Sequence, residues 1–341
     1  MNETRNARML SLDVIRGIAL CGIAFVNFQQ QWLLYPGPEG EKEAYRALDL
    51  LAHQRFFTAF TFLFGIGFAL IVDGARRRGM MAQSVMWRRL LPLFLLGIVH
   101  QILHPGEALL YYSAFGFVFL YPLTFVTDLK LRRTLATVGG IVLTLLGAPF
   151  GGIVLIPGLL LLGFAFAMWG LPQALDENPK PAAMALLVLV PLTLGMSYLQ
   201  YRSLGTVAYS HVAAVTGLIY TAMWMALVYV LLRTPLRSAL GAMFASLGRT
   251  ALTNYILATL VIIGSGLLLG YPREDAGATN EDFYTAFAVA AVMLVIQAVL
   301  SWLWLRRFGQ GPLEKGWRYL TWEAFGGPKK LQQAEAAHPD A

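Results

Sequence analysis

The sequence has few charged residues and a single cysteine. Only 13% of its 341 residues are Asp, Glu, Lys or Arg, whereas 57% are hydrophobic. Because a soluble globular domain carries about 25% charged residues, this composition excludes an ordinary soluble fold. The one cysteine, Cys21, lies within an apolar stretch, and it excludes both an intrachain disulfide bond and a cysteine-ligated metal site.

The sequence instead contains many long apolar stretches. A helix needs ~17–25 apolar residues to cross the ~30 Å hydrocarbon core of a bilayer. We identify ten such stretches, at 13–34, 55–75, 88–104, 108–127, 133–149, 152–171, 182–201, 209–232, 249–270 and 283–305. The fifth and sixth meet at a Gly- and Pro-rich junction, where one broken helix remains an alternative to two spans. The expected fold class is therefore all-α, a polytopic transmembrane helical bundle.

The ten stretches predict one integral-membrane domain over residues 1–310. Residues 311–341 are expected to form a cytoplasmic interfacial segment, rich in Trp and Tyr, that ends in a disordered tail. An amphipathic pattern within 35–54 predicts a short helix on the membrane surface. The first apolar stretch lacks a small-residue cleavage site after its apolar core, so we interpret it as a retained helix rather than a signal peptide.

Basic residues are distributed unevenly between the two expected membrane faces. With the N-terminus inside and ten alternating spans, 21 of the 26 Lys and Arg residues are cytoplasmic and five are outside. The outer five are Lys42, Arg46, Arg55, Arg202 and Arg273. An excess of Lys and Arg in cytoplasmic loops orients membrane proteins, so both termini are predicted to be cytoplasmic. Orientation accounts for the net charge of +7, and no nucleic-acid partner is expected.

On the expected outer face, histidines are the main candidates for chemistry. His100 and Glu107 flank the short turn between the third and fourth stretches. A neutral imidazole can accept a proton from a hydroxyl near pH 7, and a neighbouring carboxylate can orient it. We therefore predict His100 and Glu107 as a catalytic pair, with hydrogen bonding to the hairpin backbone as the structural alternative. Asn27 and His53 are predicted to contact the substrate.

A metal site is not predicted, although His100 and His104 are spaced i,i+4 like zinc ligands. Neither a following Glu nor a third ligand accompanies them in the sequence. Zinc in proteins is held by at least three protein ligands, so the pair alone is insufficient.

On the expected inner face, Asp13 and Arg16 stand inside an apolar helix. A charged side chain at bilayer depth costs ~2.5–3.5 kcal/mol, so it usually faces the protein interior and has a function. Asp13 and Arg16 are i,i+3 and can form a structural salt bridge. Alternatively, Arg16 and Arg249 bind the phosphates of a cytoplasmic ligand, because guanidinium groups match phosphate oxygens. Asp13 and Asn254 are assigned to ligand binding beside them.

Several motifs carry a family resemblance. They are LDVIRG (12–17) followed by VN (26–27), FLFGIGF (62–68), GRTALTNY (248–255) and GPLE (311–314). Together they resemble the YeiB family of multi-pass bacterial inner-membrane proteins, and the resemblance extends over nearly the whole chain. It implies the same fold, a location in the bacterial inner membrane and contact with membrane lipids.

The first motif also resembles the signature of a wider superfamily of transmembrane acyltransferases. Members include bacterial sugar O-acetyltransferases and the lysosomal heparan-glucosaminide N-acetyltransferase. The resemblance implies acyl-CoA as co-substrate, with Arg16 on the donor side and a small-molecule, glycan or lipid acceptor. One departure matters, because the O-acetyltransferases carry a catalytic histidine where this chain has Asn27. Either the base has moved, with His100 the best candidate, or the chemistry has been lost.

The leading hypothesis is thus acyl transfer from cytoplasmic acyl-CoA to an acceptor at the outer face or within the membrane. Asn27 would donate a hydrogen bond to a carbonyl oxygen or an acceptor hydroxyl. A small-solute transporter or channel is the first alternative, although no internal repeat of the kind found in many carriers is evident. A non-catalytic membrane partner protein is the second.

Overall fold

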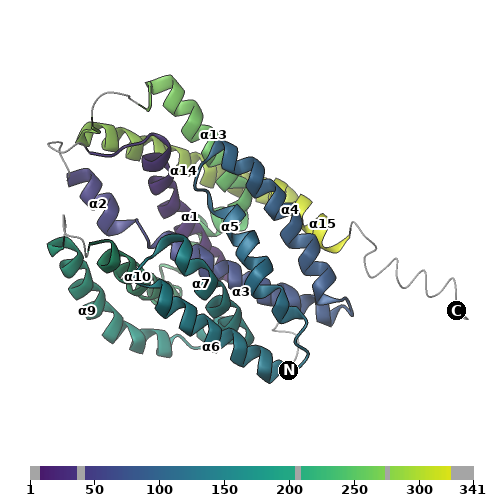
Figure 1. Ribbon diagram of the computed structural model, residues 1–341. Coiled ribbons are helices and arrows are strands. Elements are labelled where there is room, and N and C mark those ends of the chain that lie inside the picture. Colours follow the sequence, from purple (N-terminus) through teal and green to yellow (C-terminus); the bar gives the residue numbers. More distant parts are fainter. Residues whose placement is uncertain (1–7, 37–42, 204–208, 273–276, 324–341) are drawn as a thin grey trace, which may run out of the picture. The chain divides into compact units, whose positions relative to one another are not determined.

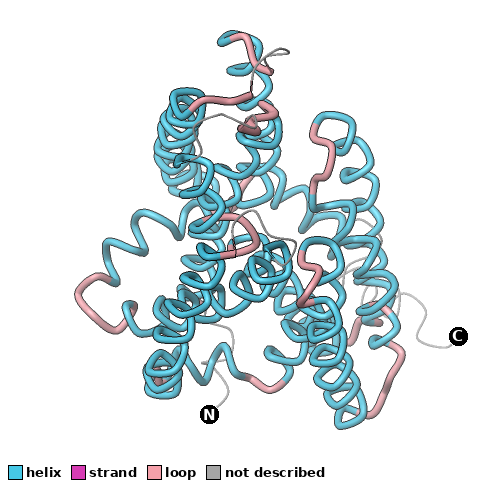
Figure 2. The backbone as a smooth tube through the Cα atoms, turned by 60° about the vertical axis from the view of Figure 1, so that its left-hand side comes forward, coloured by secondary structure: helices cyan, strands magenta, loops and turns pink. Residues whose placement is uncertain are grey.

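All regular structure in the described residues is helical (Figure 2). A computed structural model describes residues 8–36, 43–203, 209–272 and 277–323. The long helices are α1 (Leu10–Gln31), α3 (Phe56–Arg77), α4 (Ala82–Leu103), α6 (Leu129–Gly147), α7 (Gly152–Met168), α9 (Lys180–Arg202), α10 (Tyr209–Leu231), α13 (Ala251–Leu269) and α14 (Asn280–Phe308). The all-α fold class is confirmed.

Short helices connect or flank the long ones. The α-helical ones are α2 (Glu43–Leu51), α5 (Ala108–Phe115), α8 (Leu171–Glu177), α11 (Arg237–Leu240), α12 (Ser246–Arg249) and α15 (Pro312–Trp322). Two π-helical turns, η2 (Gly116–Leu120) and η4 (Gly241–Ala245), and one 3₁₀ turn, η3 (Pro122–Thr124), complete the set.

Fewer helices qualify as membrane spans than the sequence predicts. In the described part of the chain, seven are long and apolar enough to cross a bilayer, or eight if α7 and α8, bent by 59°, form one span. Each of the ten predicted stretches overlaps a helix, but the apolar helix at Ala108–Thr124 is shorter. The first turns of α6 carry three basic residues, Lys130, Arg132 and Arg133. The count of ten spans is therefore not confirmed.

The junction between the fifth and sixth stretches is a turn between two separate helices. Gly151 and Gly152 have φ values of +68° and +50°, a left-handed conformation that favours glycine and ends α6 before α7 begins. The two helices then pack closely, because a Cβ added to Gly147 would lie 2.8 Å from the carbonyl oxygen of Val154. The alternative of one broken helix over this region is excluded.

Packing groups the chain into two compact units. The first unit comprises Met1–Phe60, Leu146–Leu155 and Gly170–Gly311. The second comprises Thr61–Leu145, Ile156–Trp169 and Pro312–Ala341. The described residues 312–323 therefore pack as part of the second unit, and each unit is described by itself below.

In the first unit, the C-terminal half of α1 shares a core with α2, α13 and α14 (Figure 1). Trp32 stacks on Tyr271 with ring centroids 4.4 Å apart, and its indole N–H donates to the carbonyl of Ile262 at 3.0 Å. The predicted surface helix within 35–54 is present as α2, which buries Ala44, Leu48 and Asp49. The rest of this unit includes α9 and α10, which lie side by side.

In the second unit, α4 and α5 form a tight hairpin and α15 packs on α4. A Cβ at Gly97 would lie 2.6 Å from the amide nitrogen of Leu110, so only glycine allows this approach. The segment after 311 begins with the helix α15, and the ring of Trp322 lies 4.2 Å from the guanidinium of Arg78. The interfacial location of this segment stays a prediction. The disordered tail predicted after it lies outside the described residues.

Candidate functional site

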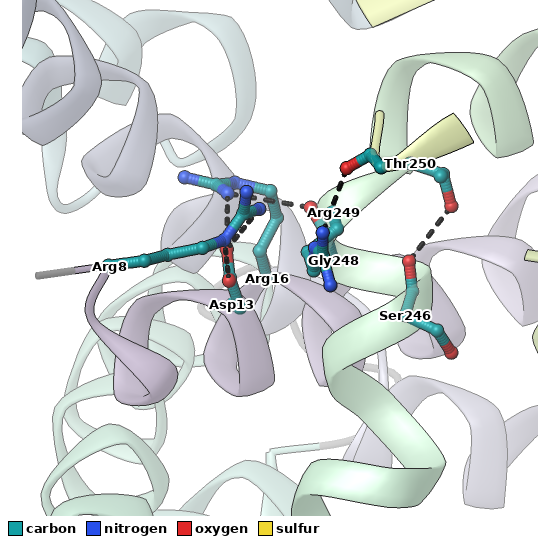
Figure 3. Close-up of polar contacts among 8 residues, drawn as sticks. Arg8, Asp13, Arg16, Ser246, Gly248, Arg249 and Thr250 are labelled. Atoms are coloured by element: carbon teal, nitrogen blue, oxygen red, sulfur yellow. Dashed lines mark hydrogen bonds and ion pairs between the residues drawn. The ribbon is translucent and has the colours of Figure 1, made fainter. Parts of the chain in front are cut away.

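Charged side chains of the first unit converge at the start of α1 (Figure 3). Asp13 is only 5% exposed, and its Oδ1 accepts from Arg8 Nη2 at 3.1 Å and from Arg16 Nη1 at 3.4 Å. Arg8 Nε donates to the other carboxylate oxygen. The predicted i,i+3 pair of Asp13 and Arg16 is thus confirmed, with Arg8 as a third member.

The same cluster receives a third arginine from α12. Close contact of the two helices brings it there, since a Cβ at Gly248 would collide with the carbonyl of Asp13. Arg16 Nη1 also lies 3.4 Å from the carbonyl oxygen of Gly248 (Figure 3). Arg249 follows directly, so the structure brings together the two arginines that the sequence assigned to phosphate binding.

Arg249 has unused hydrogen-bonding capacity. Its Nη2 donates to the carbonyl of Gly309 at 2.9 Å, whereas its Nε is buried without a hydrogen-bond partner in the described part of the chain. Burial lowers the pKa of Arg249, as does the charge of Arg8, and Asp13 opposes the shift. Arginine stays charged in proteins. Arg8 and Arg16 therefore bind the Asp13 carboxylate directly, and Arg249 lies near enough to interact with it electrostatically. This excess of positive charge is suited to a polyanion.

Asn254 lies one turn further along the chain, and its side chain is held by hydrogen bonds within the protein. Its Nδ2 donates to Thr250 Oγ1 at 2.8 Å and to Ser301 Oγ at 2.9 Å, and Thr250 Oγ1 donates to Ser301 Oγ at 2.9 Å. Gln297 donates to the carbonyl of Asn254 at 3.2 Å. These bonds fasten the start of α13 to α14, and they position the arginine-bearing turn before it.

Asn27 is 7% exposed and lies on the same helix as Arg16. Eleven residues at about 1.5 Å each separate the two along the axis, or roughly 16 Å. No hydrogen bond links the Asn27 side chain to another described residue. Its amide can therefore pair with a ligand, and the substrate contact expected of Asn27 stays a prediction.

The predicted pair His100 and Glu107 is assembled in the second unit. His100 Nδ1 lies 3.2 Å from Glu107 Oε2, but the two residues are only 2% and 1% exposed. Glu107 also caps α5, accepting from the backbone N–H groups of Leu109 at 2.6 Å and Leu110 at 2.5 Å. The carboxylate orients the imidazole as predicted, and it serves the hairpin as the structural alternative proposed.

A second carboxylate–imidazole pair lies in the first unit, and only its histidine was predicted from the sequence. His53 Nδ1 is 2.9 Å from Asp49 Oδ1, and their side chains are 19% and 9% exposed. His53 was predicted to contact substrate, whereas Asp49, Arg55 and Gln200 were not identified as site residues. The available signal was the i,i+4 spacing of Asp49 and His53 on an amphipathic segment.

No group of three or more His, Cys, Asp or Glu side chains in the described ranges is arranged to hold a metal ion. The groups that could hold a cofactor are the arginines of the first cluster, which suit phosphate rather than a cation.

Comparison with known proteins places these features in a family. Residues 166–324 match a family described as "Protein of unknown function (DUF418)". YeiB of Escherichia coli (strain K12) is 26% identical in an alignment covering 94% of this chain and 97% of YeiB. The family match and the full-length similarity to YeiB support a YeiB-like family for this chain. Its long apolar helices, together with this similarity, identify it as a multi-pass membrane protein.

Other YeiB-like relatives give the same result. An uncharacterized 39.9 kDa protein of Bacillus acidopullulyticus is 28% identical over 92% of this chain and 94% of its own length. YxaH of Bacillus subtilis (strain 168) is 32% identical, but over only 34% of this chain and 32% of YxaH. All three relatives are described as uncharacterized, so the activity of this chain must be argued from its own residues.

Proposed function

We propose that this YeiB-like protein is a membrane-embedded acyltransferase. It takes an acyl group from acyl-CoA at the cytoplasmic side of the bacterial inner membrane and passes it to a small-molecule, glycan or lipid acceptor. The observation that carries the proposal is the cluster of Arg8, Arg16 and Arg249 around the single carboxylate of Asp13.

Coenzyme A matches this cluster because its nucleotide end carries a diphosphate and a 3′-phosphate. Arginine forms paired N–H···O bonds to phosphate oxygens, and such charge-assisted bonds are about twice as strong as neutral ones. The buried Nε of Arg249 is a donor that a phosphate oxygen would satisfy. Asp13 holds Arg8 and Arg16 in place before the ligand arrives, which reduces the entropy lost on binding.

The reactive end of the ligand would lie further along α1. Asn27 is on the same helix, roughly 16 Å from Arg16 along the axis, within the reach of an extended pantetheine arm. Its amide N–H would donate to the thioester carbonyl oxygen, where negative charge develops during attack. The acceptor must also lose a proton, and a neutral imidazole is the group suited to take it. The sequence predicts His100 for that role, and the contact of His53 with Asp49 supports His53 as a second candidate.

Binding of coenzyme A to purified full-length protein in detergent tests the proposal. We expect Arg16→Gln and Arg249→Gln each to weaken CoA binding by about 10–100-fold, since a charged hydrogen bond contributes ~1.5–3 kcal/mol. Arg77→Gln removes the same charge from an exposed surface pair with Asp73 and should leave the Kd within about twofold. Pantetheine, which lacks the phosphates, should not bind measurably.

Turnover is measured in the same preparation as release of the CoA thiol from acetyl-CoA. Failure of the wild type to bind CoA, or equal weakening by Arg77→Gln, would overturn the proposal. A small-solute carrier or a non-catalytic membrane partner would then be the better interpretation.

A further inference from the structure

Around His53 the structure holds a network of polar side chains that the proposed donor site does not use. Asp49 Oδ1 contacts the imidazole, and Asp49 Oδ2 accepts from Gln200 Nε2 of α9 at 3.2 Å. Gln200 Oε1 in turn accepts from Arg55 Nη2 at 2.7 Å. Each of Asp49, Arg55 and Gln200 is at least nine-tenths buried, and Arg55 is 0% exposed.

Arg55 fixes the backbone on both sides of the pair. Its Nη1 donates to the carbonyl of Asp49 at 3.0 Å and to the carbonyl of His53 at 2.6 Å. The guanidinium also lies 5.3 Å from the ring centroid of Tyr220 on α10. A buried charge is costly unless it is hydrogen-bonded, so a guanidinium committed to these carbonyls holds the turn between α2 and α3 in one conformation.

Asp49 also selects the state of the His53 ring. A carboxylate beside Nδ1 favours the tautomer with the proton on that nitrogen, which leaves Nε2 as a proton acceptor. The imidazole and the ring of Tyr45 form a T-shaped pair, with centroids 6.1 Å apart and the planes at 72°. The side chain is still 19% exposed, so Nε2 belongs to a ring that a reactant can approach.

His53 differs from His100 of the second unit in its exposure and in what else its carboxylate partner binds. His100 is 2% exposed, and its carboxylate partner is already occupied by two backbone N–H groups at the start of α5. Asp49 caps no helix and is held by a side-chain amide instead. The His53 ring is therefore both oriented by a carboxylate and partly exposed to a reactant, whereas the His100 ring is oriented but buried.

Position along α1 also favours His53. A Cβ added to Gly22 would collide with the ring of Phe56, so the start of α3 packs on α1 at a level between Arg16 and Asn27. His53 precedes Phe56 by three residues. It also belongs to the same compact unit as Asn27 and the arginine cluster.

We propose that His53, oriented by Asp49, is the general base of the acyl transfer, and this inference rests on the proposed function. His53 Nε2 takes the proton from an acceptor hydroxyl or amine as its oxygen or nitrogen attacks the thioester carbonyl carbon. The C–S bond then breaks, the new ester or amide forms, and the leaving CoA thiolate receives the proton from the imidazolium. Asp49, Gln200 and Arg55 are positioning residues.

Acetyl-CoA turnover by the purified full-length protein, with water as acceptor, tests this assignment. General-base catalysis contributes about 10²–10⁴-fold, so His53→Gln should lower kcat by at least about 100-fold while CoA binding stays within about twofold. Free imidazole should restore part of the activity of His53→Ala. His211→Gln, which removes an exposed imidazole of the same unit, should retain wild-type turnover.

The role of Asp49 is tested by combining its substitution with that of His53, as well as by the loss of kcat in the single variant. Asp49→Asn should lower kcat with little change in the KM for acetyl-CoA, and Asp49→Glu should recover part of the rate. Residues that act as a unit are strongly non-additive, so Asp49→Asn in the His53→Gln background should cause almost no further loss.

The possible results separate the two proposals. Wild-type turnover in His53→Gln, or a loss in His100→Gln that exceeds it, overturns the assignment of His53 and leaves acyl transfer standing. Absence of both CoA binding and turnover in the wild type overturns the proposed function, and the role of His53 falls with it.

Discussion

His104 is 1% exposed at the end of α4, and burial together with the nearby His100 lowers its pKa to about 4. In the unfolded chain the imidazole has its ordinary pKa of about 6.5. Below pH 6.5 the unfolded state therefore binds a proton that the folded state does not bind until about pH 4. The stabilisation is complete above pH 6.5 and is lost as the pH falls through this window.

His104→Gln should therefore flatten the dependence of stability on pH. At pH 5 the protonation difference corresponds to about 2 kcal/mol of unfolding free energy in the wild type, relative to pH 7.5. Thermal unfolding in detergent at the two pH values measures the difference. His211→Gln serves as the control for removing an imidazole, since this side chain is exposed. An identical pH dependence in wild type and His104→Gln would contradict the burial argument.

At the scale of elements, glycines decide which charged groups meet. A Cβ at Gly17 would collide with the carbonyl of Phe244, and one at Gly248 with the carbonyl of Asp13. Small residues at a helix crossing allow the backbones to approach closely. Because the crossing brings the carbonyl of Gly248 to Arg16, it also brings Arg249 beside the Asp13 cluster. The donor site thus depends on the absence of side chains at this crossing.

Gly248→Ala should weaken CoA binding without removing any charge. The added methyl group must push the α1 and α12 backbones apart, and overpacking of this kind typically costs 1–3 kcal/mol. We expect CoA affinity to fall by about tenfold or more because Arg16 and Arg249 separate. Gly264→Ala is the matched control, since a Cβ there has no other atom within 4 Å. Equal CoA affinity in both variants would show that the crossing of α1 and α12 does not determine the geometry of the CoA site.

At the scale of the whole molecule, the number of membrane crossings depends on the region between α4 and α7. Among the described helices, seven qualify by length and composition, or eight if α7 and α8 form one span, and α5 and α6 are left out in both cases. If both cross, ten helices alternate and the turn near Thr127 lies in the cytoplasm. If neither crosses, that turn lies outside. The basic residues Lys130, Arg132 and Arg133 beside the turn favour the cytoplasm.

Labelling of single cysteines with a membrane-impermeant maleimide would measure this topology. In a Cys21→Ser background, Ser203→Cys should react in intact cells. Thr127→Cys and Thr234→Cys should react only after permeabilisation, because the positive-inside distribution predicts both turns to be cytoplasmic. Labelling of Thr127→Cys in intact cells would reduce the spans to eight or fewer. Labelling of Thr234→Cys there would reverse the predicted orientation of α10.

Much of the fold and part of the site followed from residues close together in the chain. Long apolar stretches predicted the helices because a helix in lipid must satisfy its backbone within itself. The contacts of Asp13 with Arg16 and of His100 with Glu107 were predicted because three and seven residues separate the partners. A local turn brings such partners together whatever the rest of the chain does.

Tertiary structure alone decided which distant groups meet. The carbonyl of Gly248 reaches Arg16 across 232 positions, and Gln200 reaches Asp49 across 151. No periodic pattern in the sequence predicts either contact, because helix crossings depend on how small and large side chains of different elements interlock. Composition and spacing therefore determined that the chain is a helical membrane protein with buried charge. Only packing decided that Arg249 joins Arg16, that Asp49 orients His53, and that His100 is enclosed.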